Sequence, residues 1–249
     1  MNKRCIVNVA TGEFYCKMQD RLISSFWDSV DNIYEITMMG IRPKEGVYKT
    51  SKGIDLLYWN DALPAGSRPH SESPYGFKVY AIKAVYEMGY TSILWLDSPA
   101  YAVKEDISPI FDKIEKEGYY AMSHIDPLEN WVGDDALAAC AYDRSLDGLN
   151  LPSGSCYGFD LSKDGIQQLF KTFCDAEERG FFKSQPIAEG KWHRHDEAML
   201  ALCLMMDYRE VFTFDPLFQS YSPECVIRSG GDIMKTEDGN LKIGRYHGE

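Results

Sequence analysis

Long apolar runs and an excess of basic residues are both missing from this chain of 249 residues. No stretch approaches the ~18 consecutive apolar residues that a membrane span needs, so a membrane partner is not expected. Acidic residues number 38 against 26 Lys and Arg, which gives a formal charge of −12. Because phosphate backbones are bound by clustered Lys and Arg, tight non-specific binding to nucleic acid is not expected either.

The cysteines are few and unpaired. Seven are scattered along the chain, and none forms a C-x-x-C pair. This pattern is unlike a zinc module or a disulfide framework and is typical of a reducing compartment. The apolar run near the start is too short for a signal peptide. Together these observations predict a cytoplasmic protein.

The sequence also lacks the motifs of several common enzyme classes. It contains no G-x-G-x-x-G or G-x-x-x-x-G-K-[ST] phosphate loop, no G-x-S-x-G nucleophile turn and no H-E-x-x-H zinc site. Dehydrogenases and P-loop enzymes are therefore disfavoured. A sugar nucleotidyltransferase is disfavoured as well, because it would need a Gly-rich, basic loop where this chain reads ATGEFYCK.

What the chain does contain is an alternation of strand-like and helix-like segments. The strand-like runs lie at 5–10, 32–39, 55–61, 92–97, 119–124 and 154–161. Such alternation predicts an α/β fold, a Rossmann-type, mainly parallel sheet with helices on both faces. The length fits a single domain, which we expect over residues 1–229. The polar, Gly-rich residues 230–249 are expected to form a C-terminal tail or lid.

The helix expected before the 92–97 strand has clear boundary signals. Ser73 is expected to be its N-cap and Pro74 its first residue, since these residue types favour those positions. Gly89 is expected to follow its last turn.

Sheets of this kind bind ligands beyond the carboxyl ends of their strands. Thr11, Gly12 and Asp97 each follow a predicted strand and are therefore candidate ligand-binding residues. Asp97 ends the apolar run SILWL, where it either faces a ligand or caps the next turn.

A second polar cluster lies in KWHRHDEAML, residues 191–200. On one interpretation Asp196 only caps the apolar helix expected over 196–206, where an acid is favoured by the helix dipole, and the histidines lie at the surface. On the other, His195 or Asp196 faces the substrate beside Asp97.

Four segments within residues 4–206 carry a resemblance to a known superfamily: IVNVATGEFYCKMQDRLISSF, YGFKVYAIKAVYEMGYTSILWLD, GSCYGFDLSKDGIQQLF and HRHDEAMLALC. In this order they resemble the GT-A glycosyltransferases. The stretch GSRPHSESPYGFKVYAI, together with ILWLDS, more narrowly resembles bacterial and phage proteins of this type. The resemblance implies a GT-A-like fold and the transfer of a sugar from a nucleotide-diphosphate donor, a UDP-sugar by default. The acceptor stays open, with a glycan or a modified base in phage DNA among the alternatives.

The resemblance also implies roles for individual residues. Asp196 would be the base of an inverting reaction, or would orient the donor sugar in a retaining one, with His195 beside it. The residues implied to bind the nucleotide-sugar are Thr11, Gly12, Tyr15, Lys78, Asp97, Ser98 and Arg194. Those implied to bind the acceptor are His70, Trp131, Asp134, Gly154 and Ser155.

The chain departs from the superfamily at its Asp-x-Asp metal motif, which here reads Asp97-Ser98-Pro99. A Mn²⁺ or Mg²⁺ ion needs several oxygen ligands, and proline supplies no side-chain ligand. Asp97 and His247 are the candidate metal ligands. Without a metal, Lys78 or Arg194 would neutralise the leaving diphosphate. Pro99 also favours the alternative of a non-catalytic relative that binds a nucleotide or a glycan.

Overall fold

The structure is a computed structural model of the chain. It describes residues 3–10, 15, 18–19, 21–22, 25, 36–41, 56–59, 66–102, 107–142, 150–183, 186–188, 191–206, 227–229, 232–235 and 241–244. Three candidate site residues, Thr11, Gly12 and His247, lie outside the described residues. The predicted division at residue 230 stays a prediction.

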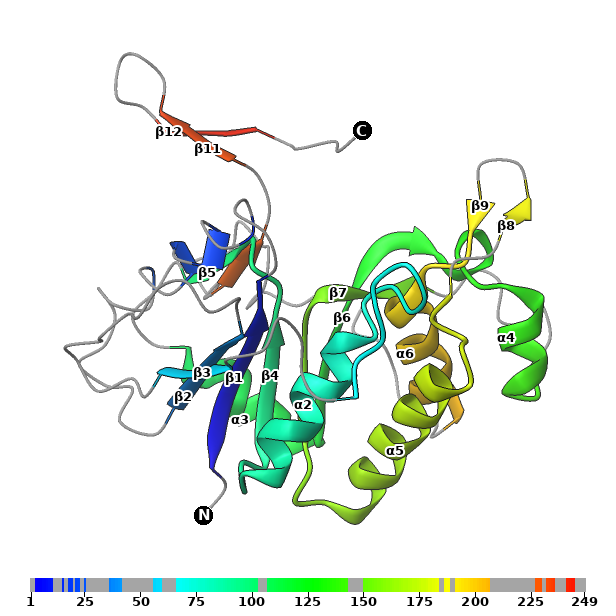
Figure 1. Cartoon of the computed structure of the whole chain (residues 1–249), viewed down its shortest axis with the longest axis horizontal. Helices are drawn as coiled ribbons and strands as arrows, with labels where there is room; N and C mark the ends of the chain where they lie inside the picture. The colour runs from blue at the N-terminus through cyan, green and yellow to red at the C-terminus, as the bar shows by residue number, and fades with distance from the viewer. Residues whose placement is uncertain are drawn as a thin grey trace.

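A six-stranded sheet lies at the centre of the fold, in the order β3-β2-β1-β4-β7-β6 (Figure 1). Its strands are β1 (Arg4–Val9), β2 (Ile36–Ile41), β3 (Leu56–Trp59), β4 (Ser92–Leu96), β6 (Tyr119–Pro127) and β7 (Asn150–Asp160). The three pairings from β3 to β4 are parallel, whereas β7 runs antiparallel to both of its neighbours. The predicted mainly parallel sheet is confirmed, with one reversed strand.

Helices cover both faces of this sheet, as predicted. One face carries α2 (Phe77–Glu87), α5 (Asp164–Glu178) and α6 (His195–Met206), and the other carries α3 (Ser108–Glu117). Successive side chains of a strand point to opposite faces. Ile93 and Trp95 of β4 accordingly join the first core, and Leu94 and Leu96 join the second. Burial on both faces explains why β4 reads as a continuous apolar run.

The start of α2 differs from the prediction. The helix begins at Phe77, after Gly76, and no side chain caps it. Ser73 is instead buried in the preceding loop, where its hydroxyl donates a hydrogen bond of 2.6 Å to Glu177 Oε1. The Ser73 hydroxyl, which was predicted to cap the helix, thus binds a residue that is distant in the sequence. The predicted end is correct, since Gly89 follows the last turn with a φ of +91°.

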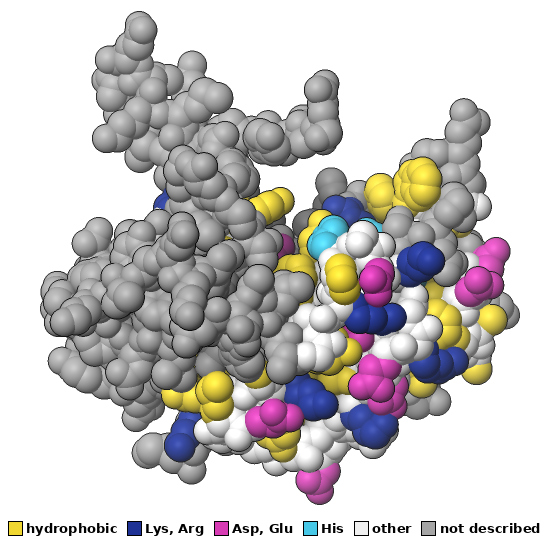
Figure 2. Space-filling model, viewed as in Figure 1, with side chains coloured by type: hydrophobic (Ala, Val, Ile, Leu, Met, Phe, Trp, Pro, Cys, Tyr) yellow, Lys and Arg dark blue, Asp and Glu magenta, His cyan; other side chains and the backbone are white. Residues whose placement is uncertain are grey.

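Shorter elements surround the sheet. They are β5 (Ala100–Ala102) paired with β10 (Ile227–Ser229), β8 (Pro186–Ala188) with β9 (Lys191–Trp192), β11 (Asp232–Lys235) with β12 (Leu241–Gly244), and the helices η2 (Leu128–Asn130) and α4 (Asp134–Ala139). Within the described residues, no helix is long and apolar enough to cross a membrane. Acidic and basic side chains are interspersed on the described face that carries α2 and α5 (Figure 2).

Candidate functional site

A cavity of about 370 Å³ lies beyond the carboxyl end of β4, bordered by β7 and the first turn of α6. This volume is within the range of small-molecule sites, ~300–1,000 Å³. Seven of the predicted site residues line it: Lys78, Asp97, Trp131, Ser155, Arg194, His195 and Asp196. Four further lining residues were not among the predicted site residues: Tyr75, Trp192, His193 and Glu197.

Three charged side chains from three separate elements meet at this cavity. Lys78 comes from α2, Asp97 directly follows β4, and Asp196 lies in the first turn of α6. The Lys78 Nζ atom is 2.9 Å from Asp196 Oδ2 and 3.2 Å from Asp97 Oδ1, and it donates a hydrogen bond of 2.8 Å to the Gly154 carbonyl. Three protein oxygens therefore lie within 3.2 Å of the buried Lys78 ammonium.

Burial makes this ion cluster consequential. The Lys78 side chain is only 2% exposed and that of Asp196 only 4%, whereas that of Asp97 is 27% exposed. Buried charges are tolerated when they are paired, and here each carboxylate is paired with Lys78. The ammonium also lies 5.0 Å from the ring centre of Tyr75 and 5.4 Å from that of Trp95. Lys78 therefore forms ion pairs with both carboxylates and holds them at the cavity.

The pKa values in this cluster depart from their ordinary positions. Burial raises the pKa of the Asp196 carboxyl to about 7, although the Lys78 ammonium beside it acts in the lowering direction. Burial lowers the pKa of Lys78, but Asp196 and Asp97 raise it by more, so its net pKa lies well above the usual value. Lys78 is therefore charged at neutral pH. Asp196 titrates close to neutrality, as a general base requires.

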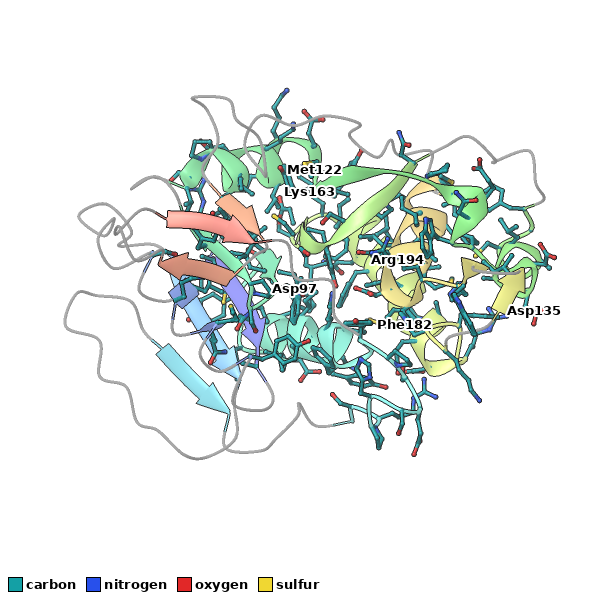
Figure 3. All side chains as sticks on the ribbon, turned by 90° about the horizontal axis from the view of Figure 1, so that it is seen from above. Asp97, Met122, Asp135, Lys163, Phe182 and Arg194 are labelled. Carbon is teal, nitrogen blue, oxygen red and sulfur yellow. The ribbon has the colours of Figure 1, made fainter. Side chains whose placement is uncertain are left out.

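A second ion pair lies at the rim of the cavity. The Arg194 Nε atom is 2.8 Å from Glu197 Oε2, and the Arg194 guanidinium lies 4.9 Å from the ring centre of Trp131. Glu197 Oε1 accepts a hydrogen bond of 2.8 Å from the Gly154 backbone N–H. The Arg194 side chain is 37% exposed, so of the two cationic residues lining the cavity it is far more accessible than Lys78. Figure 3 labels Asp97 and Arg194 on the two sides of this region.

The two histidines have different surroundings. His193 Nδ1 accepts a hydrogen bond of 3.1 Å from the Gly133 N–H, and burial lowers the pKa of His193 to about 4. His193 is therefore neutral at physiological pH. Its ring links the segment before α6 to Gly133, which precedes α4. His195 Nδ1 lies 2.9 Å from the Phe182 carbonyl, and burial lowers the pKa of His195 too. That contact requires Nδ1 to carry the proton, which leaves Nε2 as an acceptor.

Backbone strain is concentrated at the same cavity. Three non-glycine residues have a positive φ among those described, and two of them, Tyr75 at +60° and His195 at +46°, line the cavity. Their rings contact each other with centres 5.3 Å apart. Such conformations cost about 1–3 kcal/mol each and cluster at functional sites. This backbone strain could not be predicted from the sequence.

The other predicted site residues that the structure describes do not line the cavity. Ser98 is buried and donates a hydrogen bond of 3.0 Å to the Val9 carbonyl. Gly154 lies behind the lining, where an added Cβ would come within 2.8 Å of Glu197 Cγ. Asp134 is exposed on α4, and His70 is exposed but contacts the Tyr75 ring at 5.0 Å.

Tyr15 is half exposed and is also not among the lining residues. Its predicted role beside the donor stays a prediction.

The cavity does not suit a divalent cation held between its two aspartates. The Lys78 ammonium already lies within 3.2 Å of both carboxylates, and it would repel an ion bound to both of them. Among the described residues, no three His, Cys, Asp or Glu side chains are grouped as metal ligands. The predicted pair of Asp97 and His247 stays a prediction.

Comparison with known proteins identifies the fold but no family. No family model matches the chain, and no curated protein matches it in sequence. Among solved structures, the chain is similar to the apo structure of WbbM, described as a bifunctional glycosyltransferase, with a TM-score of 0.53 and 13% identity. The match covers 87% of this chain and 39% of that chain. The protein thus has a glycosyltransferase-like, Rossmann-type α/β fold.

Proposed function

We propose that this protein transfers a sugar from a nucleoside-diphosphate donor to an acceptor hydroxyl, in a GT-A-like arrangement. The observation that carries the proposal is the pair of carboxylates, Asp97 and Asp196, held by buried Lys78 in a cavity at the carboxyl ends of the strands. This is where α/β sheets bind ligands. The fold similarity to a glycosyltransferase supports the same function.

Asp196 is the proposed general base. It lines the cavity, and burial raises the pKa of its carboxyl to about 7. In an inverting transfer, Asp196 takes the proton of the acceptor hydroxyl while the acceptor oxygen bonds to the anomeric carbon. The bond from that carbon to the diphosphate oxygen breaks at the same time, and the nucleoside diphosphate leaves with the electron pair. General-base catalysis of this kind contributes ~10²–10⁴-fold to a rate.

We propose different roles for the positive charges of Lys78 and Arg194. Lys78 is buried and has three protein oxygens within 3.2 Å of its Nζ atom, so it positions the carboxylates and leaves the diphosphate to another cation. Arg194 lines the cavity with a partly exposed guanidinium, whose planar set of donors suits phosphate oxygens. We assign to Arg194 the stabilisation of negative charge on the leaving diphosphate.

A donor panel tests the proposal. The purified protein is incubated with UDP-glucose, UDP-galactose, UDP-N-acetylglucosamine and GDP-mannose, each with Mn²⁺ or with EDTA, and nucleotide release is followed by chromatography. We expect release from one donor, and we expect Asp196→Asn to slow that release by ~10²–10⁴-fold without unfolding the protein. Release that persists in EDTA would support charge neutralisation by Arg194, whereas strict dependence on Mn²⁺ would support a site formed by Asp97 and His247.

The same panel separates the alternative function. Thermal stabilisation by one nucleotide-sugar without any release would favour a non-catalytic binding protein. A ligand at 100 times its Kd stabilises the folded state by about 2.7 kcal/mol, which is readily detected as a rise in Tm. If no donor releases its nucleotide and no donor stabilises the protein, the proposed function is contradicted.

A further inference from the structure

Tyr75 is an aromatic wall of the cavity that neither the sequence motifs nor the fold similarity assigns to a function. Its side chain remains 37% exposed although its ring contacts Lys78, His70 and His195. Tyr75 has a φ of +60°, an unfavourable backbone conformation for a non-glycine residue, and its side chain lines the cavity. A strained conformation persists only when the surrounding structure enforces it.

Glu177, at the end of α5, supplies that enforcement. Its side chain is 0% exposed, yet it carries a carboxylate in contact with the loop that precedes Tyr75. Ser73 Oγ donates to Glu177 Oε1 at 2.6 Å, and Arg68 donates to the same oxygen through Nε at 3.1 Å and Nη2 at 2.8 Å. Tyr80 at the start of α2 donates to Oε2 at 2.9 Å. One buried carboxylate therefore binds both sides of Tyr75.

The close fit around Gly76 strengthens this conclusion. A Cβ atom at Gly76 would lie only 2.7 Å from Glu177 Oε1, so the chain beside Tyr75 is pressed directly against the carboxylate. Arg68 also donates to the backbone carbonyl of Glu177, which fixes the loop to the end of α5. Neither α5 nor this network lines the cavity. Glu177 is therefore not a lining residue itself, and it acts on the cavity through the segment that carries Tyr75.

The lining of the cavity indicates what Tyr75 would contact. Trp192, 52% exposed, is a second accessible aromatic side chain, and Asp97 and Asp196 offer oxygen acceptors between the aromatic walls. A pyranose ring has an apolar C–H face that packs on an aromatic ring and hydroxyls that donate to carboxylates. Carboxylates outnumber cationic side chains in the lining, three to two, which favours an uncharged ring over an acidic one.

We propose that Tyr75 is a contact platform for an uncharged pyranose ring bound in this cavity, and that Glu177 is the positioning residue that holds Tyr75 there. The choice of a sugar as ligand rests on the proposed function, whereas the coupling between Glu177 and Tyr75 does not.

Saturation-transfer NMR with methyl glycopyranosides of glucose, galactose, mannose and N-acetylglucosamine tests this proposal without requiring turnover. We expect saturation of the ring protons of at least one glycoside by the wild-type protein and by Tyr75→Phe. Tyr75→Ala should weaken that binding by about 10-fold, the effect of one aromatic contact. Glucuronic acid methyl glycoside should bind more weakly than the glucoside.

A double-mutant cycle tests the positioning role. Glu177→Gln should weaken glycoside binding when Tyr75 is present. It should cause no further loss of affinity in Tyr75→Ala, because both changes remove the same contact. Glu178→Gln, which changes the adjacent exposed carboxylate, is the matched control and should have no effect. If Glu177→Gln fails to fold, Ser73→Ala removes one hydrogen bond to the carboxylate and should act in the same direction.

The outcomes separate this proposal from the proposed function. Glycoside binding that depends on Tyr75, without any nucleotide release, would support the platform and contradict the transferase. Nucleotide release, together with glycoside binding that is unchanged in Tyr75→Ala, would support the transferase and contradict the platform. Additive effects of the Tyr75 and Glu177 changes would overturn the positioning role, and absence of binding by every glycoside would overturn the platform.

Discussion

Replacing Lys78 by Met removes the one buried ammonium between Asp97 and Asp196. Methionine is close to lysine in length and apolar, so the change leaves the aromatic contacts of the side chain largely filled while it deletes the charge. The Asp196 carboxylate, whose side chain is 4% exposed, then loses its partner at 2.9 Å. Breaking a buried ion pair by removing one member costs about 3–5 kcal/mol, because the other charge is left uncompensated.

The cost should depend on pH in a defined direction. Burial holds the pKa of Asp196 at about 7 in the folded protein, above its unfolded value, so stability falls as pH rises between those two values and then levels off. Removing the Lys78 charge raises this pKa further. Stability of the variant should therefore keep falling above pH 7, by about 1.4 kcal/mol for each unit of additional pKa shift.

Urea unfolding, followed by circular dichroism at pH 6, 7, 8 and 9, measures this effect. The gap between the wild-type protein and Lys78→Met should widen as the pH rises above about 7. Lys83→Met is the matched control, since Lys83 is exposed on the same helix and should cost little at any pH. A gap that stays constant with pH, or one no larger than that of the control, would refute the inferred coupling between Lys78 and Asp196.

Three further outcomes are expected from the geometry of the cavity. Asp196→Asn should lower kcat by ~10²–10⁴-fold with little change in donor affinity, and wild-type kcat/KM should rise with pH up to about 7 and then level off, as measured by nucleotide release. Gly154→Ala should destabilise the protein by about 1–3 kcal/mol in urea unfolding, because its Cβ would lie 2.9 Å from Glu197 Oε1. Arg194→Gln should raise the Kd for the nucleoside diphosphate by about 10-fold in calorimetric titration, whereas an unchanged Kd would remove Arg194 from the donor site.

Local sequence patterns predicted most of the fold. The apolar run of β4 and the alternation of strand-like with helix-like segments are properties of neighbouring residues, so they are visible without tertiary structure. Asp97 was predictable as a site residue because a strand end has a known place in an α/β sheet. Asp196 was predictable only as one of two alternatives, since an acid in the first turn also suits the helix dipole.

The sequence by itself determined the α/β class, the order of strands and helices, and the candidates Asp97, Asp196 and Lys78. Only the tertiary structure decided that Lys78 is buried between the two carboxylates, with three protein oxygens within 3.2 Å of its Nζ atom. It also decided that Ser73 binds Glu177 and that Tyr75 becomes a wall of the cavity. Ser73 and Glu177 are 104 positions apart, and Lys78 and Gly154 are 76 apart. The geometry of such contacts depends on how the helices pack on the sheet, which local periodicity does not reveal.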